Sequence, residues 1–331
     1  MRTLNLTASG LKYCTDKAIT SRASDPLENH KNTMTTVAEE NHDSGDRSMR
    51  FVFEETDIRG ETVHLDKAFR DVLATDQYAP PVSRLLGEFL AAAVLLSTTL
   101  KFDGKLILQV RSQGQIPLLM VECTSRQEIR AIARGADQAT SENFEDLLAN
   151  GQLAVTIDPD NGERYQGIVP LEGGSLATSL EAYFAQSEQL KTRLWLAADE
   201  NHAAGMLLQQ LPTQLAPNEE ERQMQWEHAC TLAETLHQDE LLQLKAEQIL
   251  HRLYHEDPLR VFPPGAVVFS CSCSKERTLS ALAALGTAEL LDILEEQGSI
   301  AMDCEFCNQR YIYYREDLQP LLDDNDTRTL H

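Results

Sequence analysis

The chain has 331 residues, with 29 Lys or Arg against 52 Asp or Glu, so its formal net charge is −23 at pH 7. This length predicts two domains at about 150 residues each, and the negative charge, which would repel phosphate backbones, argues against a nucleic-acid partner. No membrane segment is expected, because the longest strongly apolar stretch, residues 89–96, falls far short of the roughly 20 residues that cross a bilayer.

Residues 1–48 are polar, rich in Ser, Thr, Asn and Asp, and lack the apolar core of a secretory signal. We predict a disordered N-terminal extension, and the positions of Met34 and Met49 leave a dispensable tail or an upstream start as alternatives to a functional arm. The chain contains only seven cysteines, four of them in two close pairs. In the reducing cytoplasm, where we expect this protein, such pairs indicate metal or redox chemistry more than structural disulfides.

The first globular elements follow directly. Strands are expected at 51–53 and 62–65, on either side of Arg59-Gly60, with a short helix at 67–73. A longer helix begins at Pro80, and its apolar residues cover so much of its circumference that we expect it to lie buried in the core.

Two hairpins are predicted after this helix. The first joins 105–110 to 118–123, and the second joins 153–157 to 164–169 through the turn Pro159-Asp-Asn-Gly162. Because hairpins are interspersed with helices, we predict that residues 49–216 form an α+β domain. The chain has no G-x-G-x-x-G or G-x-x-x-x-G-K-[ST] motif, so neither a dinucleotide fold nor a nucleotide-hydrolysing enzyme is expected.

Residues 217–263 are predicted to form an acidic helical linker. Between Pro217 and Asp257 there are 10 Asp or Glu against 3 Lys or Arg, and these like charges oppose compaction, while an apolar stripe gives the segment a face to dock. A weakly held, metastable linker and an ordinary solvated surface helix both fit this pattern. His251 and His255 are spaced i, i+4 as metal ligands can be, but no Glu follows the first His as in H-E-x-x-H.

Four cysteines in two clusters, Cys271-Ser-Cys273 and Cys304-Glu-Phe-Cys307, are the strongest functional signal. Two close pairs on separate segments predict one tetrahedral site in which four thiolates hold one Zn²⁺ per chain. The 30 residues between the pairs exceed the roughly 15 to 20 of simple four-cysteine patterns, and the first pair has one spacer residue instead of two. The same pairs can also become two local disulfides. The remaining cysteines, Cys14, Cys123 and Cys230, are interpreted as buried or incidental thiols.

We predict that residues 264–320 form a small zinc module, followed by an acidic tail at 321–331. A strand at 267–269 leads into the first pair, and two helices end at Gly286 and Gly298 before the second pair. A structural zinc supplies on the order of 10 to 16 kcal/mol, whereas a whole domain is stable by about 5 to 15 kcal/mol, so metal loss should unfold the module. Peroxide or hypochlorous acid would oxidise the thiolates, and a disulfide between Cys271 and Cys273 would be strained and readily reduced.

This arrangement resembles the bacterial redox-regulated chaperone family called the 33 kDa chaperonin, which has C-x-C and C-x-x-C pairs at its end. The resemblance covers residues 50–318 and leaves out the N-terminal 48 residues. Further segments look like that family's motifs, in its order: Arg59-Gly-Glu61, Leu86-Gly-Glu88, Leu100-Lys-Phe-Asp-Gly104, Tyr165-Gln-Gly-Ile-Val-Pro-Leu171 and Tyr183-Phe-Ala-Gln-Ser-Glu-Gln189.

The resemblance implies an ATP-independent holdase that is inactive while reduced and zinc-bound. It implies that oxidation pairs Cys271 with Cys273 and Cys304 with Cys307, releases zinc, unfolds the linker and exposes a surface for unfolding or misfolding client proteins. It also implies a homodimer on oxidative activation. An exposed apolar patch would recruit unfolded chains, and the high negative charge would keep the complexes dispersed.

Two other functional classes share the cysteine patterns. A zinc-ribbon nucleic-acid adaptor uses paired-cysteine knuckles, but a charge of −23 makes a phosphate-binding face improbable. A thiol-disulfide oxidoreductase would use Cys304-x-x-Cys307 catalytically, normally within a thioredoxin-like βαβ unit that the predicted elements lack. Salt-dependent DNA or RNA binding would favour the first class, and catalytic turnover of a disulfide substrate the second.

Overall fold

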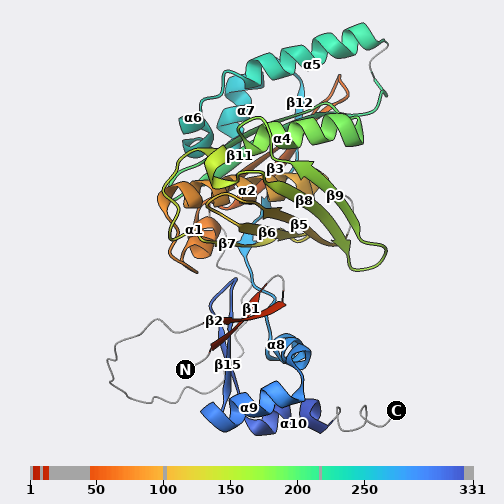
Figure 1. Ribbon diagram of the computed structural model, residues 1–331. Coiled ribbons are helices and arrows are strands. Elements are labelled where there is room, and N and C mark those ends of the chain that lie inside the picture. Colours follow the sequence, from red (N-terminus) through yellow and green to blue (C-terminus); the bar gives the residue numbers. More distant parts are fainter. Residues whose placement is uncertain (1–2, 8–9, 15–44, 100–102, 216–217, 324–331) are drawn as a thin grey trace. The chain divides into compact units, whose positions relative to one another are not determined.

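The computed structural model describes residues 3–7, 10–14, 45–99, 103–215 and 218–323 (Figure 1). The chain divides into two compact units, one of residues Ser44–Cys271 and a smaller one of Ser272–His331 with Met1–Asp43. Each unit combines helices with a sheet that contains antiparallel strands. The predicted α+β class is therefore confirmed.

The larger unit contains two sheets. One has the strand order β10-β11-β4-β3-β12, and β13 also pairs with β3. Its strands are β3 (Arg47–Phe53), β4 (Ile58–Leu65), β10 (Thr192–Ala198), β11 (Ala203–Gln210), β12 (Leu259–Val261) and β13 (Gly265–Ala266). The other has the order β14-β7-β6-β5-β8-β9 and comprises β5 (Gly104–Arg111), β6 (Leu118–Thr124), β7 (Glu128–Arg134), β8 (Gln152–Pro159), β9 (Tyr165–Pro170) and β14 (Val268–Phe269).

Helix α2 (Pro80–Thr99) lies between these sheets and contacts strands of both. Every side chain from Phe89 to Leu96 is buried, because both sides of the helix face a sheet rather than water. By length and composition α2 could cross a membrane, but 78% of its most apolar window is buried inside the protein, as a core helix requires. The larger unit also contains helices α1 (Lys67–Leu73), α3 (Phe144–Leu147) and α4 (Leu176–Tyr183). Helix α4 continues into a π-helical turn, Phe184–Glu188.

The segment predicted as a linker forms three helices: α5 (Glu219–Ala233), α6 (Gln238–Gln243) and α7 (Ala246–Tyr254). They cover the face of the β3-containing sheet that points away from α2 (Figure 1). Along β11, Ala203 and Leu207 pack in the α2 core, whereas Ala204, Met206 and Leu208 pack with the linker helices. Alternate residues of one strand thus serve two cores.

The smaller unit has a sheet of order β16-β15-β1-β2, in which β1 (Thr3–Thr7) pairs with β15 in parallel. Its other elements are β2 (Gly10–Cys14), β15 (Ile300–Cys304), β16 (Arg310–Tyr313), α8 (Lys275–Leu282) with a 3-10 turn at Ala283–Leu285, α9 (Thr287–Gln297) and α10 (Arg315–Asp323). Helix α9 ends at Gly298 with a left-handed φ of 75°, as its glycine predicted. The described core of this unit has only eight buried apolar side chains.

The observed boundaries differ from the sequence-based ones in three places. Strand β3 starts at Arg47, within the predicted extension, because Asp46 and Ser48 are buried against the fold. The extension also contains β1 and β2, while residues 1–2, 8–9 and 15–44 lie outside the described residues. At the other end, α10 extends into the predicted tail to Asp323, and residues 324–331 lie outside the described part. Finally, the larger unit continues past the predicted module start to Cys271.

Arg59-Gly60 is part of strand β4 and not a turn, which corrects the sequence-based expectation. Gly60 lies directly opposite Phe51 of β3, and a Cβ at this position would clash with the Phe51 ring. The glycine is thus required by close packing across the strand pair, a role that glycine in a strand can have as well as a turn.

Candidate metal centre

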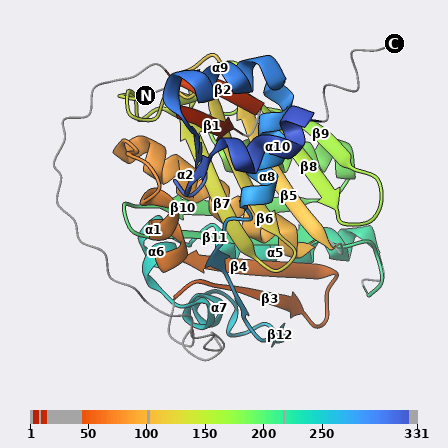
Figure 2. The same cartoon turned by 90° about the horizontal axis from the view of Figure 1, so that it is seen from below.

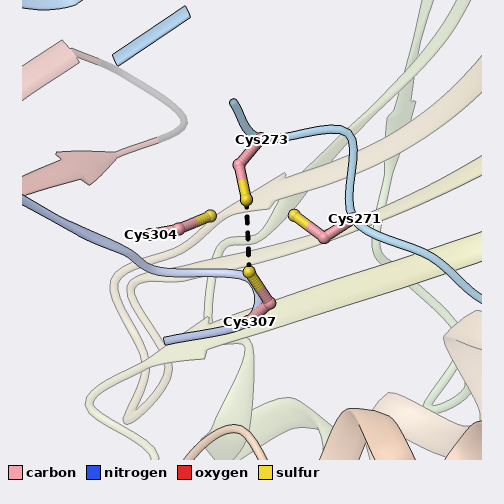
Figure 3. Close-up of side chains that lie close together, drawn as sticks. All are labelled: Cys271, Cys273, Cys304 and Cys307. Carbon is pink, nitrogen blue, oxygen red and sulfur yellow. Dashed lines mark hydrogen bonds between the residues drawn. The ribbon is translucent and has the colours of Figure 1, made fainter. Parts of the chain in front are cut away.

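The four cysteines of the sequence motif converge. Cys271 and Cys273 follow β14, Cys304 ends β15, and Cys307 lies in the turn before β16. Their Sγ atoms all lie within 4.8 Å of one another, and Figure 3 shows the side chains pointing toward a common centre. Cys273 Sγ and Cys307 Sγ are 3.4 Å apart and hydrogen-bonded. Sulfurs about 2.3 Å from a tetrahedral zinc would lie about 3.8 Å apart, so these four cysteines, none of which is in a disulfide, fit such an ion.

The second pair is arranged by a tight turn. The backbone N–H groups of Cys307 and Asn308 both donate to the carbonyl oxygen of Cys304, at 3.3 and 2.8 Å, and Asn308 has a left-handed φ of 56°. Asparagine tolerates this conformation better than most residues. The turn thus brings two thiols to the same side of the hairpin.

The first pair is set by a helix start. Ser274 caps α8 by accepting a hydrogen bond from the Arg277 backbone N–H at 3.2 Å. The Arg277 guanidinium in turn donates to the carbonyl and hydroxyl oxygens of Ser272, at 2.8 and 2.7 Å. These contacts fix the residue between the two cysteines, so the C-x-C loop is held by its own helix.

Two further side chains donate to the sulfurs, and the sequence did not identify either. Arg130 Nη1 lies 3.5 Å from Cys271 Sγ, while its Nε and Nη2 donate to Glu122 Oε2 at 3.0 and 2.7 Å. Tyr311 Oη donates to Cys273 Sγ at 3.2 Å, and this hydrogen bond raises the pKa of Tyr311. Donors at sulfur favour the thiolate form that binds metal. Arg130 carried no sequence signal, because strand β7 was not predicted.

Among the described residues, no other group of three or more His, Cys, Asp or Glu side chains is placed to hold a metal ion. His251 and His255 do stack on one helix face, with ring centroids 5.7 Å apart, but they are outside any such group. Cys123 and Cys230 are buried, and burial raises the pKa of each thiol to about 12. They are therefore packed thiols that stay protonated near neutral pH, in line with their interpretation as buried thiols. The side chain of Cys14 is outside the described part of the chain.

A second candidate functional surface lies where the linker helices cover the sheet; we call it the linker–sheet interface. Its aromatic centre is Tyr254, which is 1% exposed and lies edge-on to Phe53 with ring centroids 4.9 Å apart. The Tyr254 hydroxyl donates to the Ala229 carbonyl oxygen at 3.0 Å, and burial raises its pKa. The interface is built from Met49, Phe51, Phe53, Ile58, Met206 and Leu208 of the sheet with Trp226, Leu241, Ile249, Leu250, Leu253 and Tyr254 of the linker.

One buried ion pair fixes the start of the linker. Arg222 Nη1 lies 3.1 Å from Asp57 Oδ2, and the two side chains are 10% and 5% exposed. Asp57 also accepts from the backbone N–H groups of Gln214 and Leu215. Further along, His64 Nε2 lies 2.8 Å from the Leu242 carbonyl oxygen. The acidic segment is thus docked by an apolar face and a few polar anchors; that it is weakly held stays a prediction.

Comparisons with known proteins agree with this architecture. The family model described as Hsp33 protein matches residues 46–314. The chain is 52% identical over 279 residues to the 33 kDa chaperonin of Pseudomonas paraeruginosa, covering 83% of this chain and 94% of that protein. It is also 52% identical over 280 residues to the 33 kDa chaperonin of Pseudomonas syringae pv. syringae, covering 83% and 93%. The crystal structure of the 33 kDa chaperonin from Thermotoga maritima has the same fold, with a TM-score of 0.71 at 21% identity over 85% of this chain and 99% of that chain.

Proposed function

The chain belongs to the Hsp33 family of chaperones, and on that premise we propose that it is a redox-regulated, ATP-independent holdase of the bacterial cytoplasm rather than an enzyme. The observation that carries the proposal is the convergence of four cysteine sulfurs within 4.8 Å of one another. Such a group of sulfurs can hold a metal ion while reduced and form disulfides when oxidised. The reduced and the oxidised forms of these cysteines can therefore correspond to two conformations of the protein.

In the reduced state, Cys271, Cys273, Cys304 and Cys307 hold one Zn²⁺, which supplies a cross-link between two chain segments. This support matters because the smaller unit has only eight buried apolar side chains in its described core. Units with so little apolar burial usually need a metal or disulfides for stability. Loss of the ion should therefore loosen this unit.

Oxidation converts the metal-binding thiolates into disulfides, which no longer hold the ion. In each disulfide, two thiolates lose two electrons to one peroxide molecule, which takes up two protons and leaves as two waters. We propose pairing within each motif, Cys271 with Cys273 and Cys304 with Cys307. The 3.4 Å separation of the Cys273 and Cys307 sulfurs makes the cross-pair the alternative that a disulfide map would decide.

Clients would bind where the linker helices now lie. If these helices leave, the sheet exposes a contiguous set of apolar side chains that includes Phe51, Phe53 and Met206. Exposed apolar patches of this kind bind other apolar chains. The activated protein is proposed to form a homodimer, while ATP, nucleic acid and membranes take no part.

The proposal is tested by light scattering of a thermally unfolding client. Reduced, zinc-loaded protein should leave aggregation unchanged, whereas protein treated with peroxide and mild heat should suppress it, release one zinc per chain and lose four titratable thiols. Zinc removal by a chelator under reducing conditions separates metal loss from disulfide formation. Equal suppression before and after oxidation would contradict the proposal.

A further inference from the structure

A short segment, residues 259–270, runs along the edges of both sheets of the larger unit; we call it the strap. Its first part, β12, pairs antiparallel with β3, placing Arg260 opposite Val52 (Figure 2). Its next part, β13, pairs with β3 at Ser48 and Arg47. Its last part, β14, pairs in parallel with β7. The strap therefore occupies positions where each sheet would otherwise present an unpaired strand.

The strap is held by backbone hydrogen bonds and by three apolar side chains, Leu259, Val267 and Phe269, which pack in or against the two cores. Phe262 N–H donates to the Arg50 carbonyl oxygen at 2.9 Å, and Val267 N–H donates to the Asp46 carbonyl oxygen at 3.1 Å. Five of its twelve residues are exposed, including Val261 at 45%, six are partly buried, and Val267 is buried. The Arg50 guanidinium lies 4.4 Å from the Phe262 ring centroid. Because main-chain bonds are common to every sequence, the edge of β3 accepts an extended chain with little regard to its side chains.

Both ends of the strap continue into segments that oxidation is proposed to release. Toward the C-terminus, Ser270 N–H donates to the Ile129 carbonyl oxygen at 3.1 Å, and the next residue is the metal ligand Cys271. Toward the N-terminus, the strap follows helix α7 of the linker by four residues. When both anchors are lost, β12 keeps only its short ladder with β3 and the partly buried Leu259 side chain.

We propose that the outer edge of β3 and the adjoining Glu54, residues 50–54, is a strand-addition site for extended segments of unfolding client proteins, which take the place of β12. This inference rests on the proposed function and gives it a second kind of contact. Unfolded chains carry unpaired N–H and C=O groups, as an uncovered sheet edge does. An added strand would also place alternate side chains beside Phe51 and Phe53, extending the apolar face that the linker uncovers.

The hydrogen bonds between β12 and β3 show which backbone amides of the strap take part in pairing. Glu54 N–H donates to the Pro258 carbonyl oxygen at 2.8 Å, and Phe262 and Arg50 form the other hydrogen-bonded pair. In antiparallel pairing, bonded and non-bonded pairs alternate, so Val52 and Arg260 face each other with their N–H and C=O groups, while the Val261 amide points away from β3. The Arg260 amide thus takes part in pairing with β3, as the Phe262 amide does, whereas the Val261 amide between them does not and is a matched control.

The test uses a fluorescent peptide of the strap sequence 258–263 and the full-length oxidised protein. The peptide should bind oxidised but not reduced, zinc-loaded protein, and a chemically unfolded client should displace it. N-methylation at Arg260 should weaken binding by about tenfold or more, and N-methylation at Val261 should leave it unchanged. Val52→Pro, which lacks the edge N–H, should lose peptide binding and part of its holding capacity, whereas Val52→Thr should keep both.

Three outcomes would overturn the inference. Equal binding of both methylated peptides, failure of clients to displace the peptide, or loss of the site to a second copy's strap in the oxidised dimer would each exclude client strand addition. If Val52→Pro does not fold, the methylated pair on the unmodified protein still decides. Oxidised protein that does not suppress aggregation at all would contradict the proposed function itself, whereas normal suppression with unaltered Val52→Pro behaviour would contradict the edge site alone.

Discussion

Removal of the Tyr254 ring should undock the linker without any oxidant. This side chain is 1% exposed, packs edge-on to Phe53, and donates a hydrogen bond to the Ala229 carbonyl oxygen, so it joins α7 to both the sheet and α5. Replacing a buried aromatic side chain by alanine costs about 3 to 5 kcal/mol. If that loss falls on docking alone, the undocked population rises by about 10² to 5 × 10³-fold.

Native-state hydrogen exchange measures this shift directly. In Tyr254→Ala, amides of α5, α6 and α7 should exchange faster by about that factor, while amides of α2 in the main core should change little. The reduced, zinc-loaded variant should also suppress client aggregation. His251→Ala is the control on the same helix, because His251 is exposed and its removal should shift exchange by less than about threefold.

Two results would refute the reasoning. Unchanged exchange in the linker helices of Tyr254→Ala would show that the aromatic contact does not hold them. Equal acceleration in α2 would show that the linker and the core open together, so that the linker–sheet interface is not a separate cooperative unit.

Three further predictions concern other sites. Cys271→Ser leaves three thiols, so zinc affinity, measured by competition with a chelator, should fall by at least about a hundredfold. Burial raises the pKa of Glu61 to about 7, so its protonation stabilises the fold fully below about pH 4.5 and this contribution is lost as pH rises through 7; Glu61→Gln should raise the unfolding free energy at pH 8 by up to about 3 kcal/mol. Arg130→Gln leaves the buried Glu122 without its closest cation and should lower the unfolding free energy by about 3 kcal/mol in denaturant titrations.

Each of these predictions has a control. Cys230→Ser removes a thiol that lies outside the four-cysteine group, and should keep zinc affinity. Glu142→Gln and Arg126→Gln change exposed side chains and should alter stability by less than about 0.5 kcal/mol. Unaltered zinc affinity in the first variant would remove that cysteine from the ligand set. An unaltered pH profile in the second would assign the transition to another group, such as Glu88, whose pKa burial also raises to about 7.

Local signals were enough to predict several elements. The hairpins β5–β6 and β8–β9, the buried helix α2, and the end of α9 at Gly298 all follow from alternation, turn residues or capping that lie within a few residues of each other. Each cysteine pair was equally local, since a helix start sets the first pair and a tight turn sets the second. The contact of Arg130 with Cys271 could not be predicted from local signals, because Arg130 lies on a strand that is distant in sequence.

Other elements could not be predicted because tertiary packing defines them. Strand β11 is buried along its whole length, since α2 covers one face and the linker helices the other, so no alternation of apolar and polar residues appears. Strands β12 and β13 have only two or three residues, too few for any periodic pattern, whereas the equally short β14 was predicted as a strand at 267–269. Gly60 was expected to lie between two strands and not within one. The Phe51 ring that requires a glycine at this position belongs to another strand, so the residues next to Gly60 give no sign of it.

The chain has only two tryptophans, and both lie at the linker–sheet interface: Trp195 on β10 is partly buried there, and Trp226 on α5 is 8% exposed. Departure of the linker would transfer the Trp226 indole to water and uncover the Trp195 indole. The metal centre contains no indole, so chemistry at the sulfurs leaves no direct trace in this emission. Intrinsic fluorescence therefore follows undocking separately from oxidation, and stopped-flow mixing with oxidant would time the two events in unlabelled protein.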